Sequence, residues 1–199
     1  MNEQAGSLVN EERLEYFLKQ KLDEVLRNNK VGTTDTAQFY LWNLLLNPLI
    51  AEIDRKRAKL PLAITYSQAQ SRGIGSRQSV ADFKLVEDTC LLVAGFWWNN
   101  LSRSLVDVDY FINLGRSAYD NVGRTDSVLS EILGELSGYF KEITNALIEM
   151  SVIINMAKAS ESELLRVYEA WLHTHNKALA MILAKHGVTP SVIGVNRAN

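Results

Sequence analysis

Apolar residues recur at steps of three and four along most of the 199-residue chain, and this spacing constrains the fold more than any other feature. Such steps place apolar side chains on one face of an α-helix, and that face has to be buried against another element. The segment from Glu11 to Asn28 shows the pattern clearly. No stretch alternates apolar and polar residues as a half-buried strand does. The sequence therefore predicts an all-α protein.

Seven segments carry the helical pattern, and polar or glycine-containing stretches separate most of them. Thr33-Thr34-Asp35 offers N-cap side chains for the second segment, and Gly187 stands where a left-handed residue would end the last. We predict an irregular bundle of six or seven helices in a single domain, residues 11–187. Residues 1–10 are expected to be a flexible N-terminus and residues 188–199 a C-terminal tail. The expected helices span about residues 11–28, 36–57, 60–70, 78–98, 105–122, 126–157 and 160–186.

Two segments are candidates for the hydrophobic centre of the bundle. The segment from Phe39 to Ile50 is apolar nearly all round, which is typical of a central helix. The helix that carries Phe83 to Trp97 has a long apolar face. Gly115 and Gly134 interrupt other helical stripes, and their missing side chains would let a second helix approach closely. We expect the first two segments to form the centre.

Charge, cysteine content and apolar length limit the possible partners and the cellular compartment of the protein. The net charge is −2 and no basic stripe is present, which argues against a nucleic-acid partner. The single cysteine, Cys90, lies in an apolar run, which fits a reducing compartment and makes the thiol a poor nucleophile. The first ten residues lack the regions of a signal peptide. The longest apolar stretch, residues 39–50, is well below the ~20 residues that span a bilayer. We expect a cytoplasmic protein without membrane insertion.

Asp88 is the first candidate for a functional residue. Its helical neighbours include Leu85, Leu91 and Leu92, so apolar groups would enclose its carboxylate. An enclosed carboxylate needs a cation or a hydroxyl as a partner. The sequence offers four such partners, which are Arg103, Tyr110, Arg116 and Tyr119.

Asp107 and Asp109 form a second candidate. Two carboxylates could share a metal or divide the roles of acid and base. On a regular helix, however, a spacing of two turns them about 200° apart. Capping by Asp107 and a favourable charge from Asp109 at the helix start would explain both residues.

Metal and cofactor sites are not predicted. His173 and His175 face different sides of a helix, and His175 and His186 would lie about 16 Å apart. No set of cysteine and histidine residues has the spacing of metal ligands. We expect His175, which lies on the apolar stripe of the last helix, to be a core residue.

Several segments resemble an uncharacterised family of helical bacterial proteins. These are residues 87–96, 105–111 and 115–119, together with residues 168–174 and 187–190 near the C-terminus. Glu87 stands where the family pattern has glycine, and Trp97-Trp98 extends beyond its aromatic pair. The resemblance supplies no activity. It implies that six residues matter together, namely Asp88, Asp107, Asp109, Tyr110, Gly115 and Tyr119.

The sequence leaves two functions open. The lack of catalytic motifs, the glycines on helix faces and the four tryptophans favour a non-enzymatic interaction or regulatory protein. Its partner would be another protein or a second copy in a homodimer. The alternative is a small-molecule-binding protein or an enzyme. Its ligand-binding site would be built from Asp88, Arg103, Asp107, Asp109, Tyr110, Arg116 and Tyr119.

Overall fold

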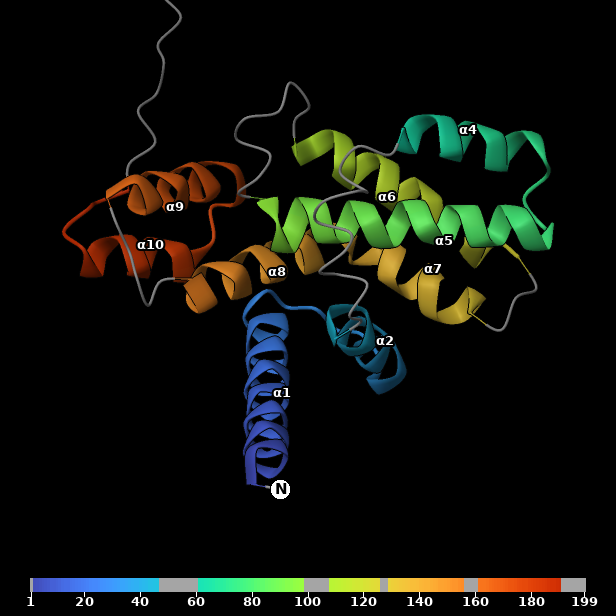
Figure 1. The fold of residues 1–199 in the computed structure, drawn as a ribbon. Coiled ribbons are helices and arrows are strands. Elements are labelled where there is room, and N and C mark those ends of the chain that lie inside the picture. The colour runs from blue at the N-terminus through green and yellow to red at the C-terminus, as the bar shows by residue number, and fades with distance from the viewer. Residues whose placement is uncertain (1, 47–60, 99–107, 126–128, 156–160, 191–199) are drawn as a thin grey trace, which may run out of the picture.

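The computed structural model describes residues 2–46, 61–98, 108–125, 129–155 and 161–190, which form helices joined by turns (Figure 1). Within these ranges there is no β-strand, so the all-α prediction is confirmed. The helices are α1 (Asn2–Asn28), α2 (Asp35–Leu46), α4 (Leu62–Ser71), α5 (Arg77–Leu91), the π-helical segment η1 (Leu92–Phe96), α6 (Val108–Gly123), α7 (Ser130–Gly138), α8 (Phe140–Asn155), α9 (Glu161–Thr174) and α10 (Lys177–Lys185).

The bundle is built around α5 and its continuation η1. In Figure 1, α5 crosses the middle of the molecule, with α4 and α6 on one side and α7 and α8 on the other. Phe83, Val86 and Leu91 on α5 are completely buried, and the burial continues through η1. A side chain at Gly95 in η1 would meet Leu147 Cβ of α8 at 2.7 Å, so this glycine lets the two helices cross closely. The helix expected over residues 78–98 therefore occupies the centre.

The second helix expected at the centre lies instead at the edge, in the part that the structure describes. On α2 only Ala37 and Leu41 are buried, and Phe39 is 62% exposed. A central position is therefore wrong for residues 39–46, and residues 47–50 lie outside the described ranges. An apolar residue on each face of a helix does not require burial on each face, because single apolar side chains are common at protein surfaces.

The expected six or seven helices are too few, since the described residues already contain nine α-helices. The long helix expected over residues 126–157 is divided into α7 and α8 at Tyr139, just after Gly138, a residue that favours helix less than most residues do. The last expected helix is divided into α9 and α10 at His175. This residue has a left-handed backbone with φ of 50°, and Asn176 then caps α10 by accepting a hydrogen bond from the Ala178 amide at 2.7 Å. His175 is exposed, so its expected place in the core is wrong.

Three local predictions from the sequence are confirmed. Thr34 caps α2, because its hydroxyl accepts a hydrogen bond from the Ala37 amide at 3.3 Å. Gly187 has a φ of 77°, as expected for the left-handed residue after a helix. Gly115 marks a close approach, since an added Cβ would overlap Phe140 and lie 2.7 Å from Cβ of Cys90.

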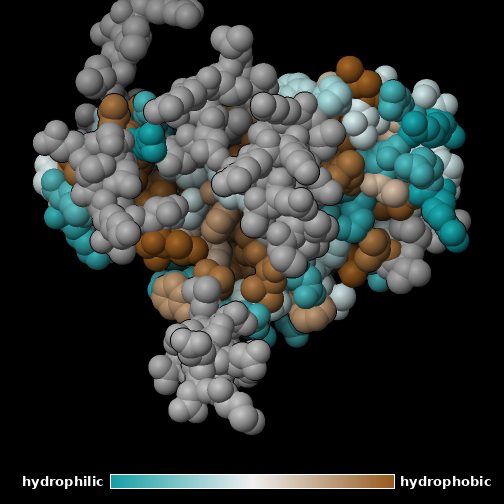
Figure 2. All heavy atoms as spheres, viewed as in Figure 1, coloured by the Kyte–Doolittle hydropathy of each residue, from teal (hydrophilic) through white to brown (hydrophobic). Residues whose placement is uncertain are grey.

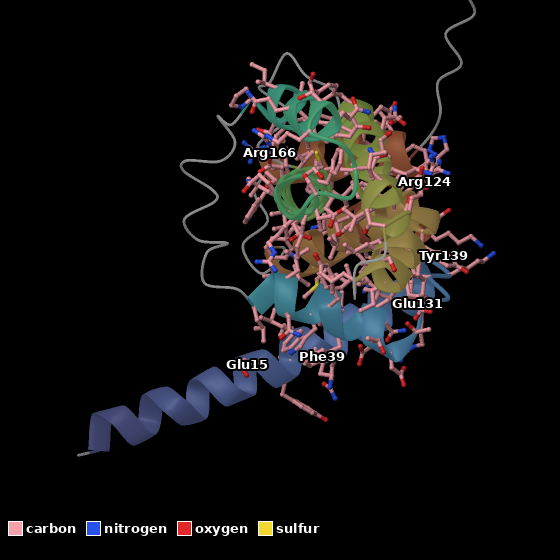
Figure 3. All side chains as sticks on the ribbon, turned by 90° about the vertical axis from the view of Figure 1, so that its right-hand side faces the viewer. Glu15, Phe39, Arg124, Glu131, Tyr139 and Arg166 are labelled. Atoms are coloured by element: carbon pink, nitrogen blue, oxygen red, sulfur yellow. The ribbon has the colours of Figure 1, made fainter. Side chains whose placement is uncertain are left out.

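Helix α1 is the one element that stands out from the bundle. It begins at Asn2, well before the expected start at Glu11, and its first half projects away from the other helices (Figures 1 and 3). Its second half is packed against α8, and Leu22, Val25 and Leu26 are buried there. Helix α1 is thus anchored to the bundle through its second half.

Candidate functional site

The strongest cluster of polar side chains surrounds Asp88 in the last turn of α5, just before η1. Ser76 caps this helix by accepting a hydrogen bond from the Ser79 amide, which fixes where the helical turns begin. Lys84 lies one turn before Asp88, and its ammonium group is 2.6 Å from Oδ2 of Asp88. Tyr40 of α2 donates a hydrogen bond of 2.7 Å to Oδ1, and the hydroxyl of Tyr119 on α6 donates to the same oxygen at 3.4 Å. We call these four residues the Asp88 cluster.

The Asp88 cluster joins three helices that are distant in sequence. The Lys84 ammonium also lies 4.8 Å from the centre of the Tyr40 ring, as in a cation–π contact. Tyr119 is completely buried and packs edge-on against Phe140. Burial raises the pKa of both tyrosines, and the charge of Asp88 raises it further. The phenols therefore keep their protons and act as hydrogen-bond donors.

Glu87, the neighbour of Asp88, is the least satisfied polar group in the described part of the chain. Its side chain is 0% exposed, and neither carboxyl oxygen has a hydrogen-bond partner there. Burial raises the pKa of Glu87 well above its usual value, the charge of Asp88 raises it further, and Lys84 opposes both effects. The carboxyl of Glu87 therefore keeps its proton to a higher pH than an exposed glutamate does. A buried polar group without a partner is destabilising and calls for an explanation.

Cys90 lies on the same buried face of α5. Burial raises the pKa of its thiol, and the nearby Glu87 raises it further. The thiol therefore stays protonated. The Cβ of Cys90 packs against Gly115 of α6. Because nucleophilic attack requires a thiolate, Cys90 contributes to packing and not to catalysis in this surrounding.

The structure brings together two of the predicted site residues, Asp88 and Tyr119. Asp109 and Arg116 instead line a shallow groove of about 250 Å³ next to the junction of α7 and α8. Asp109 lies in the first turn of α6, where its charge favours the helix start as expected. Tyr110 is 41% exposed and packs on Phe111. Among the described residues, no hydrogen bond or ion pair connects Asp109, Tyr110 or Arg116 to the Asp88 cluster. Arg103 and Asp107 lie outside the described residues.

Tyr40, Lys84 and Glu87 were not among the predicted site residues. A hydrogen bond from Tyr40 could have been predicted from the sequence, because the hydroxyl of a tyrosine buried in an apolar helix generally finds a hydrogen-bond partner. Glu87 lies one turn from Phe83 and from Leu91, so its position on the buried face could be derived from the helical period. Nothing in the sequence shows which partner Tyr40 would find.

A second buried acidic side chain, Glu149 of α8, anchors the base of α1. Asn28 donates a hydrogen bond to Oε1 at 3.0 Å, and Asn29 donates to Oε2 at 2.8 Å. Asn176, the cap of α10, donates to the same Oε2 at 3.0 Å. Three amides thus surround one carboxylate, and they tie the end of α1 to α8 and to the start of α10.

A groove of about 540 Å³ separates α1 from α2. Lys19 and Asp23 form its α1 wall, and the α2 wall includes Asp35, Phe39 and Trp42. Figure 3 places Phe39 beside the base of the projecting helix, and Figure 2 shows apolar residues at the surface where α1 and α2 meet the bundle. The groove is therefore open, partly aromatic and edged by charges of both signs.

Comparison of the chain with protein-family models, with curated proteins and with solved structures finds no match. The resemblance to a bacterial helical family thus stays a prediction. Among the described residues, no three His, Cys, Asp or Glu side chains are grouped as metal ligands would be. No helix in the described ranges has the length and apolar character needed to cross a membrane. A proposal for the function therefore rests on the arrangement of the described side chains.

Proposed function

We propose that the protein is a non-enzymatic interaction or regulatory protein that binds another protein through the face formed by α1 and α2. The observation that carries this proposal is the exposure of Tyr16 (66%) and Phe39 (62%) on the two helices that enclose the groove. Tyr16 lies one turn before Lys19, so it extends the α1 wall of the groove. Exposed aromatic residues with a polar rim are typical of protein interfaces, where they supply much of the binding energy.

The anchoring of α1 supports the same proposal. Its base is held by the three amides on Glu149 and by buried Leu22, Val25 and Leu26. The first half of α1 projects away from the other helices, and an isolated helix of a few turns is marginally stable in water. A partner that packs against this half would stabilise it. The setting that we propose is a bacterial cytoplasm, on the basis of the resemblance and of the single apolar cysteine.

Photo-crosslinking in cells of the native organism tests the proposal. A photoreactive phenylalanine replaces Phe39, and the matched control replaces Ile64, which is exposed on α4 at the other side of the bundle. We expect a defined protein adduct from position 39 and none from position 64. The mass of the adduct tells whether the partner is a second copy or another protein. If position 39 gives no adduct, or both positions give the same ones, the proposed surface is wrong.

A second candidate function, binding of a small molecule, is favoured by the unsatisfied carboxyl of Glu87. A hydrogen-bonding group of a ligand would supply the partner that Glu87 lacks among the described residues. Thermal-shift measurements with a panel of amines, alcohols and amides test this function. A ligand that stabilises the wild type and fails to stabilise Glu87→Leu would support it. A panel without any stabilising ligand, or with equal effects on both proteins, would count against it.

A further inference from the structure

We infer that the groove between α1 and α2 receives an arginine side chain of the partner protein. This inference rests on the proposed function and states which chemistry the partner presents to that same surface. It is carried by three features, which are two aspartates that no described residue pairs with, two aromatic side chains on one wall, and a comparable site on the other side of α2 that a lysine of the chain fills.

The two aspartates lie on opposite walls of the groove. Asp23 lies on α1, one turn after Lys19, and Asp35 lies in the first turn of α2. Within the described ranges, neither side chain makes a hydrogen bond or an ion pair. The charge of Asp35 favours the start of α2, whereas Asp23 is half-buried and has no such local role. Because a partly desolvated carboxylate is stabilised by a cation, Asp23 is suited to bind one.

Two aromatic residues contribute to the α2 wall of the groove. Phe39 and Trp42 are one turn apart, so they share a face of this helix. Phe39 is 62% exposed, whereas Trp42 is half-buried and packs against the core. This packing holds the indole of Trp42 in place before any ligand binds. The faces of aromatic rings carry partial negative charge and attract a cation that lies over them. The wall therefore favours the same sign of charge as the aspartates do.

The other side of α2 shows this chemistry in a filled site. The Lys84 ammonium lies 4.8 Å from the centre of the Tyr40 ring and 2.6 Å from Oδ2 of Asp88, so an aromatic ring and a carboxylate hold one cation together. The groove offers rings and carboxylates in the same combination. Lys19, the basic residue of its lining, makes no ion pair and no cation–π contact within the described ranges. We therefore expect the cation to come from a partner.

Arginine fits this groove better than lysine does. Its guanidinium is planar, stacks on aromatic faces and donates hydrogen bonds from several edges, which suits carboxylates on two walls. The ammonium of lysine is a compact, strongly hydrated point charge. Arginine is also enriched among the interface residues that supply most of the binding energy. The groove of about 540 Å³ is larger than one side chain, so we expect residues next to the arginine to enter with it.

Titration of the full chain with a small peptide, followed by NMR at constant ionic strength, tests the inference. The probe is glycyl-arginyl-glycine blocked at both ends, and the matched control carries citrulline, which has nearly the same shape without the charge. We expect the indole N–H signal of Trp42, assigned with Trp42→Phe, to shift with a dissociation constant on the order of 1–10 mM, because one side chain supplies a small part of an interface. The citrulline peptide should cause no saturable shift. Equal shifts with both peptides, or no saturable shift with either, would overturn the inference.

Substitutions in the groove test which residues hold the guanidinium. Asp23→Asn and Asp35→Asn should each raise the dissociation constant of the arginine peptide about twofold to fivefold, as for other exposed ion pairs. Lys19→Gln should lower it, because this change removes a repelling charge. The matched control is Asp109→Asn, exposed on α6, which should leave the constant unchanged. The NMR spectrum also shows whether each variant is folded. Equal constants for the wild type and the three groove variants, or an equal change in Asp109→Asn, would contradict the inference.

Photo-crosslinking from position 39 separates this inference from the proposed function. When Asp23→Asn is combined with the photoreactive residue, we expect a lower yield of the adduct, and we expect the crosslinked segment of the partner to contain an arginine. An adduct that forms equally well with Asp23→Asn, or a segment without arginine, would refute the inference and leave the proposed function standing. The absence of any adduct from position 39 would contradict the proposed function and, with it, the inference.

Discussion

Replacing the buried Glu87 by glutamine is expected to change how the stability of the protein depends on pH. The two side chains have nearly the same shape, and a protonated carboxyl and an amide are both neutral. In the native state burial keeps Glu87 protonated, and the neighbouring Asp88 adds to this effect. In the unfolded chain the carboxyl returns to its ordinary pKa of 4.5 and loses its proton above that pH. The wild type therefore releases a proton on unfolding, and Glu87→Gln does not.

The sign and the size of the effect follow from proton linkage. Because the folded-state pKa is raised, the native state binds one more proton than the unfolded state between the two pKa values. The free energy of unfolding then falls by about 1.4 kcal/mol for each pH unit in this window. The loss begins as the pH rises past 4.5 and ends at the folded-state pKa. In the same window, Glu87→Gln becomes progressively more stable than the wild type.

Urea unfolding at several values between about pH 5 and 8 measures this difference, with both proteins at the same concentration so that any self-association affects them equally. The pH at which the difference stops growing reports the folded-state pKa of Glu87. Glu131→Gln, which neutralises an exposed carboxylate on α7, is the control and should stay within about 0.5 kcal/mol of the wild type. A difference between Glu87→Gln and wild type that is constant over the whole range would mean that Glu87 is ionised in the native state, and the reasoning would be refuted.

Three further substitutions test the packing. Gly115→Ala should lower the free energy of unfolding by about 1–3 kcal/mol, because its Cβ would overlap Phe140, and unchanged stability in urea would show that the helices separate easily. Gly134→Ala, in the middle of α7 and exposed, should raise stability by about 0.5–1 kcal/mol, and a lower thermal midpoint would contradict this. Glu149→Gln should lose about 2–3 kcal/mol, since its amide nitrogen would face amide donors such as Asn28, and hydrogen exchange at the base of α1 should increase with it. Unchanged exchange there would argue against the anchoring role of Glu149.

The helical class and much of the helix placement were predictable from the sequence, because they depend on local spacing and on local caps. Thr34 and Gly187 are examples, since each acts within one turn of its own helix. The position of α2 was not predictable in the same way. Its apolar residues show that it packs against something, but which of its faces is covered depends on helices elsewhere in the chain. The break at His175 was missed because a left-handed histidine has no strong sequence signal, although Asn176 is a good N-cap residue.

In the candidate site, too, features set by local helical spacing were predictable, and features set by the packing of distant helices were not. The sequence identified Asp88 as an enclosed carboxylate and included Tyr119 among its partners, and the hydrogen bond at 3.4 Å joins them. It could not rank Tyr119 against Tyr110, because both lie on α6 and only the crossing of α5 and α6 decides which of them faces inward. Glu87 was predictable, since the helical period alone assigns it to the buried face of α5.

The Asp88 cluster and the surface of α2 are connected through two consecutive residues. Tyr40 turns inward and donates its hydroxyl to Asp88, whereas Phe39 turns outward beside the groove. Helix α2 is held on the bundle by buried Ala37 and Leu41 and by partly buried apolar side chains that pack against the core, and the hydrogen bond from Tyr40 adds to this packing. Hydrogen bonds to charged groups contribute about 1.5–3 kcal/mol each. The Asp88 cluster therefore has a structural role, because it helps to hold in place the helix that carries the exposed Phe39.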